Sequence, residues 1–112
     1  MERNIELLEQ TMCHINDHPT QHDQSTWVQP YDCGTIACFA GWAALLSGMT
    51  SREILNVNMR IKGAELLGLT EDEAHTLFDT INTRPVLELM VKDLVNGYVL
   101  GDPDAYFEQA EE

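Results

Sequence analysis

Two cysteines at the start of the most apolar stretch of the chain are the first candidates for chemistry. Residues 36–46 contain no charged side chain. The stretch is too short to cross a membrane, which takes about 20 apolar residues, so it predicts a buried helix. Cys33, just before this helix, would have its thiolate stabilised by the helix dipole. Cys38 lies inside the apolar stretch, where cysteine usually packs as a small hydrophobic residue.

A second group of candidate ligands lies near the N-terminus. His14 and His18 are four residues apart, so in a helix they share one face. With Cys13, His22 and Cys33 they could supply four zinc ligands. Proline at position 19 ends the helix directly after His18, which favours solvent-exposed histidines over a metal site. We therefore predict no metal and no cofactor. The alternative is a metal- or thiol-dependent function, with these candidate residues: Cys33, Cys38, His14 and His22.

The chain contains none of the compact catalytic motifs, so no enzyme activity is predicted. There is no phosphate-binding glycine loop, no Gly-x-Ser-x-Gly elbow and no His-Glu-x-x-His helix. Residues 62–70 resemble the first helix and turn of a helix-turn-helix. The helix that follows has no Lys or Arg and carries these acidic residues: Glu71, Asp72, Glu73 and Asp79. Such a helix would repel phosphates, so we predict no direct contact with nucleic acid.

The charge balance favours a basic partner protein. Six Lys and Arg residues oppose 19 Asp and Glu residues, for a net charge of -13. This charge repels nucleic acid and anionic membranes. The leading hypothesis is an interaction protein whose acidic faces, residues 71–79 and the tail 102–112, dock on a basic surface. Aromatic residues dominate binding hot spots. The candidate exposed anchors are Trp27, Tyr31, Tyr98, Tyr106 and Phe107.

Two other possibilities stay open beside that hypothesis. The carboxylates could imitate DNA phosphates and occupy the site of a nucleic-acid-binding protein. An apolar helix face left uncovered could instead form a homodimer.

The hydrophobic pattern predicts an all-α fold in one compact domain, residues 1–112. Five to six short helices should surround a buried central helix at about 35–47, with Thr35 or Asp32 as its N-cap. A helix at about 2–17 precedes an ordered loop at 18–34, and capping boxes begin helices after positions 50 and 70. Alternation is weak throughout, so strands are confined to 27–28 or 57–59 if any form. No signal peptide or membrane span is evident, and three cysteines suit a reducing cytoplasm.

Residues 33–43, Cys-Gly-Thr-Ile-Ala-Cys-Phe-Ala-Gly-Trp-Ala, carry a resemblance to a known group. The chain resembles small uncharacterised proteins of bacteriophages of mycobacteria and related actinobacteria. Residues 22–27 and 64–70, the latter followed by Leu77 and Phe78, fit the same resemblance, which spans roughly 14–80. It implies a phage or phage-derived accessory protein in the host cytoplasm. On that basis we expect the partner to be a host protein, and we expect interference with host growth.

Overall fold

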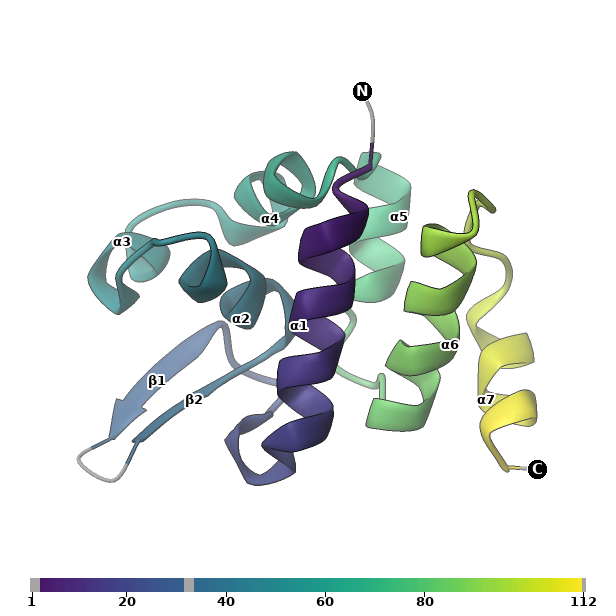
Figure 1. The fold of residues 1–112 in the computed structure, drawn as a ribbon, viewed down its shortest axis with the longest axis horizontal. Coiled ribbons are helices and arrows are strands. Elements are labelled where there is room, and N and C mark those ends of the chain that lie inside the picture. The colour runs from purple at the N-terminus through teal and green to yellow at the C-terminus, as the bar shows by residue number, and fades with distance from the viewer. Residues whose placement is uncertain (1–2, 32–33, 112) are drawn as a thin grey trace.

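The computed structural model describes residues 3–31 and 34–111, with backbone alone at 30, 31, 34 and 111. Within these residues the chain is mostly helical, which confirms the predicted all-α class (Figure 1). Seven α-helices are described there, where five to six were predicted. None of them has the length and apolarity needed to cross a bilayer. The elements in chain order are α1 (Ile5–Asp17), the short 3₁₀ helix η1 (Pro19–Gln21), β1 (Val28–Tyr31), β2 (Gly34–Ala37), α2 (Phe39–Leu46), α3 (Ser51–Leu55), α4 (Met59–Leu67), α5 (Glu71–Leu77), α6 (Arg84–Val95) and α7 (Pro103–Glu111).

Helix α2 forms the buried centre of the molecule, as its apolar sequence predicts. The side chains of Phe39, Ala40, Ala43 and Ala44 are fully buried. Helix α1 contacts both α2 and α6, and α4 contacts α2 and α5 (Figure 1). Three of the four buried residues are alanines, so the neighbouring helices approach α2 closely.

A two-stranded hairpin occupies the place where the central helix was expected to begin. Strands β1 and β2 pair antiparallel, with Val28 opposite Ala37. The predicted start of the helix at about 35 is therefore wrong, and the predicted loop 18–34 is a strand in part. A short apolar run suits a buried strand as well as a buried helix, and pairing with β1 selects the strand here.

The N-cap of α2 also differs from the prediction. Cys38 holds this position, and its Sγ accepts a hydrogen bond from the backbone N–H of Gly41 at 3.4 Å. Thr35 lies inside β2, so its assignment as cap is wrong. The other predicted cap, Asp32, lies outside the described residues.

Both predicted capping boxes are confirmed. The Thr50 hydroxyl accepts from the N–H of Glu53 at 3.2 Å, and the Glu53 carboxylate accepts from the N–H of Thr50 at 3.0 Å. Thr70 and Glu73 repeat this arrangement at the start of α5 with distances of 3.2 and 3.1 Å. The turn between α4 and α5 uses Gly68, whose φ of 69° is left-handed. These local signals fix where α3 and α5 begin.

The two ends of the molecule carry different elements. Figure 1 shows α3 and the strands β1 and β2 at one end and α7 at the other. Helix α7 packs on α6 through the buried ring of Tyr106. The Tyr106 hydroxyl donates to the carboxylate of Asp93 at 2.7 Å and accepts from the N–H of Gly101 at 3.2 Å. The acidic C-terminal segment is thus anchored to the core as a helix.

Candidate functional site

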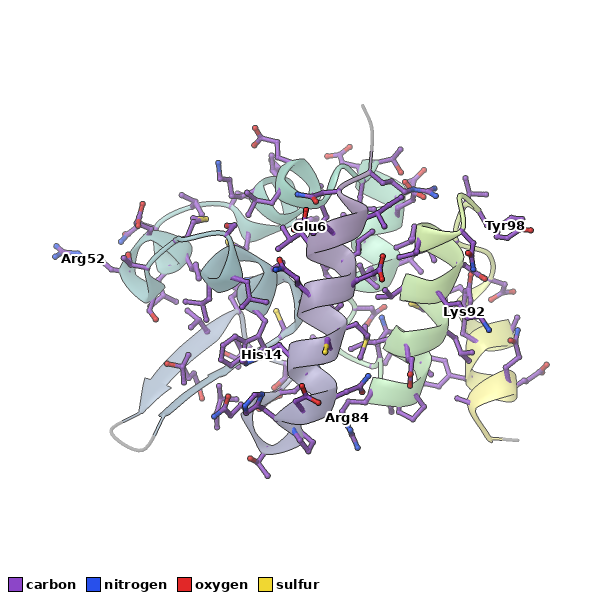
Figure 2. The ribbon with its side chains drawn as sticks, viewed as in Figure 1. Glu6, His14, Arg52, Arg84, Lys92 and Tyr98 are labelled. Atoms are coloured by element: carbon purple, nitrogen blue, oxygen red, sulfur yellow. The ribbon has the colours of Figure 1, made fainter. Side chains whose placement is uncertain are left out.

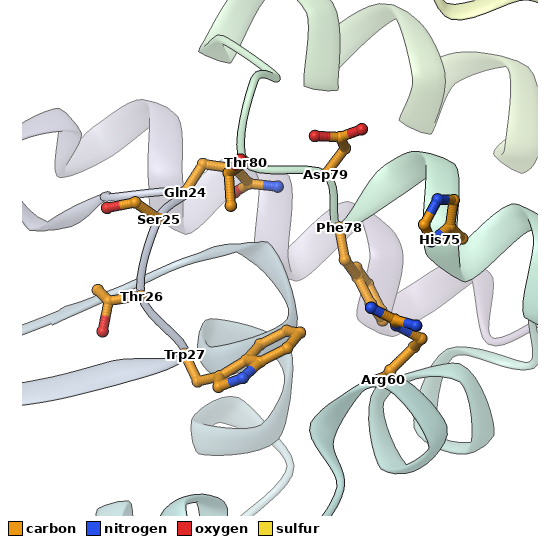
Figure 3. Close-up of a pocket in the computed structure, with 9 residues that line it drawn as sticks. All are labelled: Gln24, Ser25, Thr26, Trp27, Arg60, His75, Phe78, Asp79 and Thr80. Atoms are coloured by element: carbon orange, nitrogen blue, oxygen red, sulfur yellow. The ribbon is translucent and has the colours of Figure 1, made fainter.

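A pocket of about 280 Å³ opens where the segment before β1, helix α4 and the end of α5 meet (Figure 3). Its aromatic wall consists of Trp27 and Phe78, whose ring centroids lie 6.4 Å apart with perpendicular planes. This edge-to-face geometry is a favourable one for aromatic pairs. The lining residues are Gln24, Ser25, Thr26, Trp27, Arg60, His75, Phe78, Asp79 and Thr80.

A glycine in the central helix allows Trp27 to take its place in this wall. A Cβ atom at position 41 would lie 1.7 Å from the carbonyl oxygen of Trp27, so only glycine permits the approach. The neighbouring carbonyl of Thr26 accepts a hydrogen bond from the N–H of Cys38 at 2.9 Å. The backbone at position 27 is therefore held against α2, while 37% of the Trp27 residue surface stays exposed.

A second glycine performs the same function for Phe78. A Cβ atom at position 63 would lie 2.9 Å from ring atoms Cε2 and Cζ of Phe78. Phe78 follows the last residue of α5, and its N–H donates to the carbonyl of Ala74 at 2.8 Å. The ring is buried against α4, so this part of the aromatic wall belongs to the core.

The buried side chain of Gln24 joins the pocket wall to two helices. Its Nε2 donates to the carbonyl of Leu77 at 3.0 Å, and its Oε1 accepts from the N–H of Phe39 at 3.1 Å. The first bond lies at the C-terminal end of α5 and the second at the N-terminal end of α2. Since a buried amide must be hydrogen-bonded, these bonds fix the segment before β1 in position.

The pocket holds charges of both signs. Asp79 is partly buried, and its Oδ1 accepts from the N–H of Ile81 at 3.2 Å. Arg60 and His75 are exposed, and neither forms an ion pair within the described residues. In Figure 3 the Phe78 ring lies between the side chains of Asp79 and Arg60. The pocket thus offers an aromatic surface, a carboxylate and a guanidinium to a partner.

The hydroxyl of Ser25, one of the lining residues, is held by Asp23. The Ser25 hydroxyl donates to Oδ1 of Asp23 at 2.6 Å, and its N–H donates to the same oxygen at 3.0 Å. These hydrogen bonds hold the pKa of Asp23 below its usual value. The Ser25 hydroxyl is thus hydrogen-bonded to a carboxylate that lies outside the pocket lining.

The structure separates the predicted acidic residues. Glu71 and Asp72 are exposed in the first turn of α5, and Asp79 follows its C-terminal end at the pocket. Glu73 was expected on the same face, and this is wrong, because only 8% of its surface is exposed. Its carboxylate forms an ion pair with Arg3 at 2.6 Å and completes the capping box of α5.

The predicted aromatic anchors separate in the same way. Trp27 is exposed beside the pocket, and Tyr98 is exposed beyond the end of α6 (Figure 2). Tyr106 is buried, so its assignment as an exposed anchor is wrong, and Phe107 is partly buried against the core. The backbone of Tyr31 ends β1, and its side chain lies outside the described atoms.

Of the two candidate thiols, that of Cys38 lies in the described part of the chain. Cys38 is buried, and burial raises the pKa of its thiol to about 11 although backbone N–H groups partly oppose the shift. The thiol is therefore protonated at neutral pH, which supports a packing and capping role for Cys38. The prediction for Cys33 concerns a residue outside the described part of the chain.

The candidate histidines lie in different surroundings. The ring of His14 (Figure 2) stacks on His18 and contacts Trp42, with centroid distances of 4.4 and 4.1 Å. Burial and then the charge of His18 lower the pKa of His14. His22 lies 2.8 Å from Oε1 of Gln24. Within residues 3–31 and 34–111, no three His, Cys, Asp or Glu side chains are grouped so that they could share a metal ion.

Most of the lining residues were not predicted as site residues. Trp27 and Asp79 were predicted, whereas Arg60, His75 and Phe78 were not. Their signal in the sequence is weak: Arg60 is one of few cations in an acidic chain, and Phe78 directly precedes Asp79. Segments 24–27, 60 and 75–80 are far apart in the sequence and meet only through helix packing.

No protein-family model matches this chain, and no match was found among curated proteins or among solved structures. The resemblance to actinobacterial phage proteins therefore stays a prediction. The function has to be inferred from the residues of the chain itself.

Proposed function

We propose that this protein is a non-enzymatic binding module that docks on a basic surface of another protein. One observation carries the proposal. The fold brings Trp27 and Asp79 to a single pocket, at the end of a helix whose first turn exposes Glu71 and Asp72. We call these four residues the acidic docking face. A helix with carboxylates at both ends and an aromatic anchor at one of them fits a basic partner.

Net charge supports the choice of partner. At -13, the protein attracts basic surfaces and repels acidic ones over a Debye length of about 8 Å at physiological salt. Complementary charge mainly raises the association rate and selects the partner. Affinity must come from a buried contact, and Trp27 is an exposed aromatic residue that lines the same pocket as Asp79.

The size of the pocket supports a side chain of a partner as its occupant. A pocket of about 280 Å³ has room for one long side chain of a partner. The stem of a lysine or arginine side chain would pack on Trp27, with its charge near Asp79.

We further propose that the partner is a host protein of an actinobacterium and that binding interferes with growth. This part of the proposal rests on the resemblance of residues 33–43 to phage proteins. Growth of an actinobacterial culture that expresses the chain, compared with a culture that expresses a binding-deficient variant, tests it.

The binding experiment uses two variants of equal net charge. The first neutralises the acidic docking face with Glu71→Gln, Asp72→Asn and Asp79→Asn. The second is the matched control, which neutralises three exposed carboxylates on α1 and α6 by the changes Glu6→Gln, Glu9→Gln and Glu88→Gln. Each protein is immobilised and exposed to a nuclease-treated actinobacterial lysate, and retained proteins are quantified by mass spectrometry.

The proposal expects a partner that the wild-type and control proteins retain at low salt and that the docking-face variant loses. Trp27→Ala should lose the same partner although no charge changes. Equal losses from both triple variants would show that bulk charge, not this face, attracts the partner. Displacement of the partner by DNA would instead identify a mimic of nucleic acid.

A further inference from the structure

A basic and apolar surface lies on α3 and α4, in contrast to the acidity of the whole chain. Three of the six Lys and Arg residues fall between positions 52 and 62: Arg52, Arg60 and Lys62. The same stretch contains one acidic residue, Glu53. Arg60 lines the pocket at Trp27, so the cations of this surface are Arg52 and Lys62. Figure 2 shows Arg52 extending from α3 away from the molecule.

Large aliphatic side chains accompany these cations at the surface. Leu55 is 60% exposed, Val57 43% and Ile61 52%. A shallow hollow of about 470 Å³ runs beside them, lined by Met49, Arg52, Glu53, Asn56, Val57 and Lys62. Val57 lines this hollow, and Leu55 and Ile61 are exposed on α3 and α4, the helices that also carry Arg52 and Lys62. Exposed apolar side chains on neighbouring elements often mark an interaction site.

The cations of this surface have no internal carboxylate partner within the described residues. The ion pair found there joins Arg3 to Glu73, on other elements. The carboxylate nearest to Arg52 in the sequence, that of Glu53, accepts a hydrogen bond from the N–H of Thr50 in the capping box of α3. The carboxylate nearest to Lys62 in the sequence is that of Glu65 on the same helix, and no ion pair joins the two in the described part of the chain. Arg52 and Lys62 are therefore available to carboxylates from outside the chain.

We propose that Arg52, Leu55, Val57, Ile61 and Lys62 form a second docking surface, which binds an acidic amphipathic helix of another protein. Carboxylates of that helix would pair with the two cations at the hollow. Its apolar side chains would cover the three exposed aliphatic residues, as in other complexes of a helix with a groove. This second surface is independent of the acidic docking face and would let the protein bridge two partners of opposite charge.

A second copy of this chain fits the surface less well. Its acidic helix α7 has its tyrosine buried against its own α6, so it presents carboxylates without an apolar face. A phosphate backbone has no apolar groups that could cover the three aliphatic side chains, so nucleic acid does not match this surface.

The test uses a synthetic 14-residue peptide as the probe, with leucine at helix positions i, i+3, i+4 and i+7 and glutamate at most others. The peptide is titrated into the 15N-labelled full chain and followed by NMR. The largest amide shifts are expected within residues 49–62. Arg52→Glu with Lys62→Glu should raise the Kd by about tenfold or more, since two ion contacts become repulsive. Val57→Ser should weaken binding by several-fold.

The matched control is Arg84→Glu with Lys92→Glu. These two changes on α6 give the protein the same net charge as the first double variant, and they should weaken binding by less than about twofold. Equal weakening by both double variants would overturn the proposal, as would shifts confined to other segments. Equal affinity for a peptide with serine in place of leucine would contradict the contact between apolar side chains of the helix and the three exposed aliphatic residues. Tighter binding to phosphatidylglycerol vesicles, or a dimer that Arg52→Glu and Lys62→Glu abolish in sedimentation, would assign the surface to lipid or to a second copy.

Discussion

The change Gly41→Ala tests how the Trp27 wall of the pocket is held. A Cβ atom at this position would lie 1.7 Å from the carbonyl oxygen of Trp27 and 2.9 Å from Cβ of Ala37. Contacts below 3.0 Å are not tolerated, and the oxygen belongs to the backbone, so the segment before β1 must move by more than about 1 Å. That movement would also strain the hydrogen bond from Cys38 to Thr26.

The magnitude follows from three contributions. Overpacking in a core costs about 1–3 kcal/mol, and the upper value applies because backbone has to move. Weakening the adjacent hydrogen bond adds about 1 kcal/mol. Alanine regains about 1 kcal/mol over glycine in a helix. The free energy of unfolding should therefore fall by about 3 kcal/mol, which for a chain of 112 residues lowers the Tm by roughly 12 °C.

The assay is a set of thermal melts of three glycine variants. Gly63→Ala should cost about 1 kcal/mol, because the Phe78 ring that lies 2.9 Å away is a side chain and can shift. Gly101→Ala is the matched control and should change stability by less than about 0.5 kcal/mol, since no atom lies within 4 Å of its added Cβ. A Tm for Gly41→Ala equal to that of the Gly101→Ala control would refute the close approach of Trp27 to α2.

Two substitutions and one labelling experiment test contacts away from the pocket. Glu73→Ala removes an ion pair and half of a capping box, so the free energy of unfolding in urea should fall by about 2 kcal/mol; an effect as small as that of the exposed control Glu71→Ala would contradict the buried pair. At pH 8 a thiol reagent should label exposed Cys13 quickly, but Cys38 only after denaturation, because a pKa of about 11 leaves roughly one thiol in a thousand ionised. Peptide mass spectrometry assigns the sites, and rapid labelling of native Cys38 would contradict its burial. Tyr106→Phe removes the hydroxyl hydrogen bonds of α7 and should cost about 1–2 kcal/mol, with faster amide exchange in α7; unchanged exchange would show that these bonds do not anchor the helix.

Local signals in the sequence predicted most of the helices. Thr50 and Thr70 each precede a glutamate by three residues, and this pattern is sufficient to define a helix start without tertiary contacts. The apolar stretch 36–46 correctly indicated the buried centre. Its beginning was wrong because residues 34–37 pair with β1, and that pairing is a tertiary contact that no local pattern reports.

The candidate site was predictable only in its separate parts. Trp27 and Asp79 were chosen for residue type and charge, but their meeting depends on Gly41 and Gly63, which set how closely the segments approach α2 and α4. Glu73 was wrongly predicted to be exposed, because a carboxylate within a run of acidic residues usually lies at the surface. Its pairing with Arg3, 70 residues away in the sequence, removes it from that surface.

Hydrogen–deuterium exchange of the purified complex with a captured partner shows directly whether the partner covers the acidic docking face. Amide exchange is compared between the free and the bound protein along the whole chain. If the partner binds the acidic docking face, amide exchange should slow in residues 24–27 and 71–80, which contain that face, and should stay unchanged in α7. Protection confined to α6 and α7, with no change at the pocket, would contradict binding at that face.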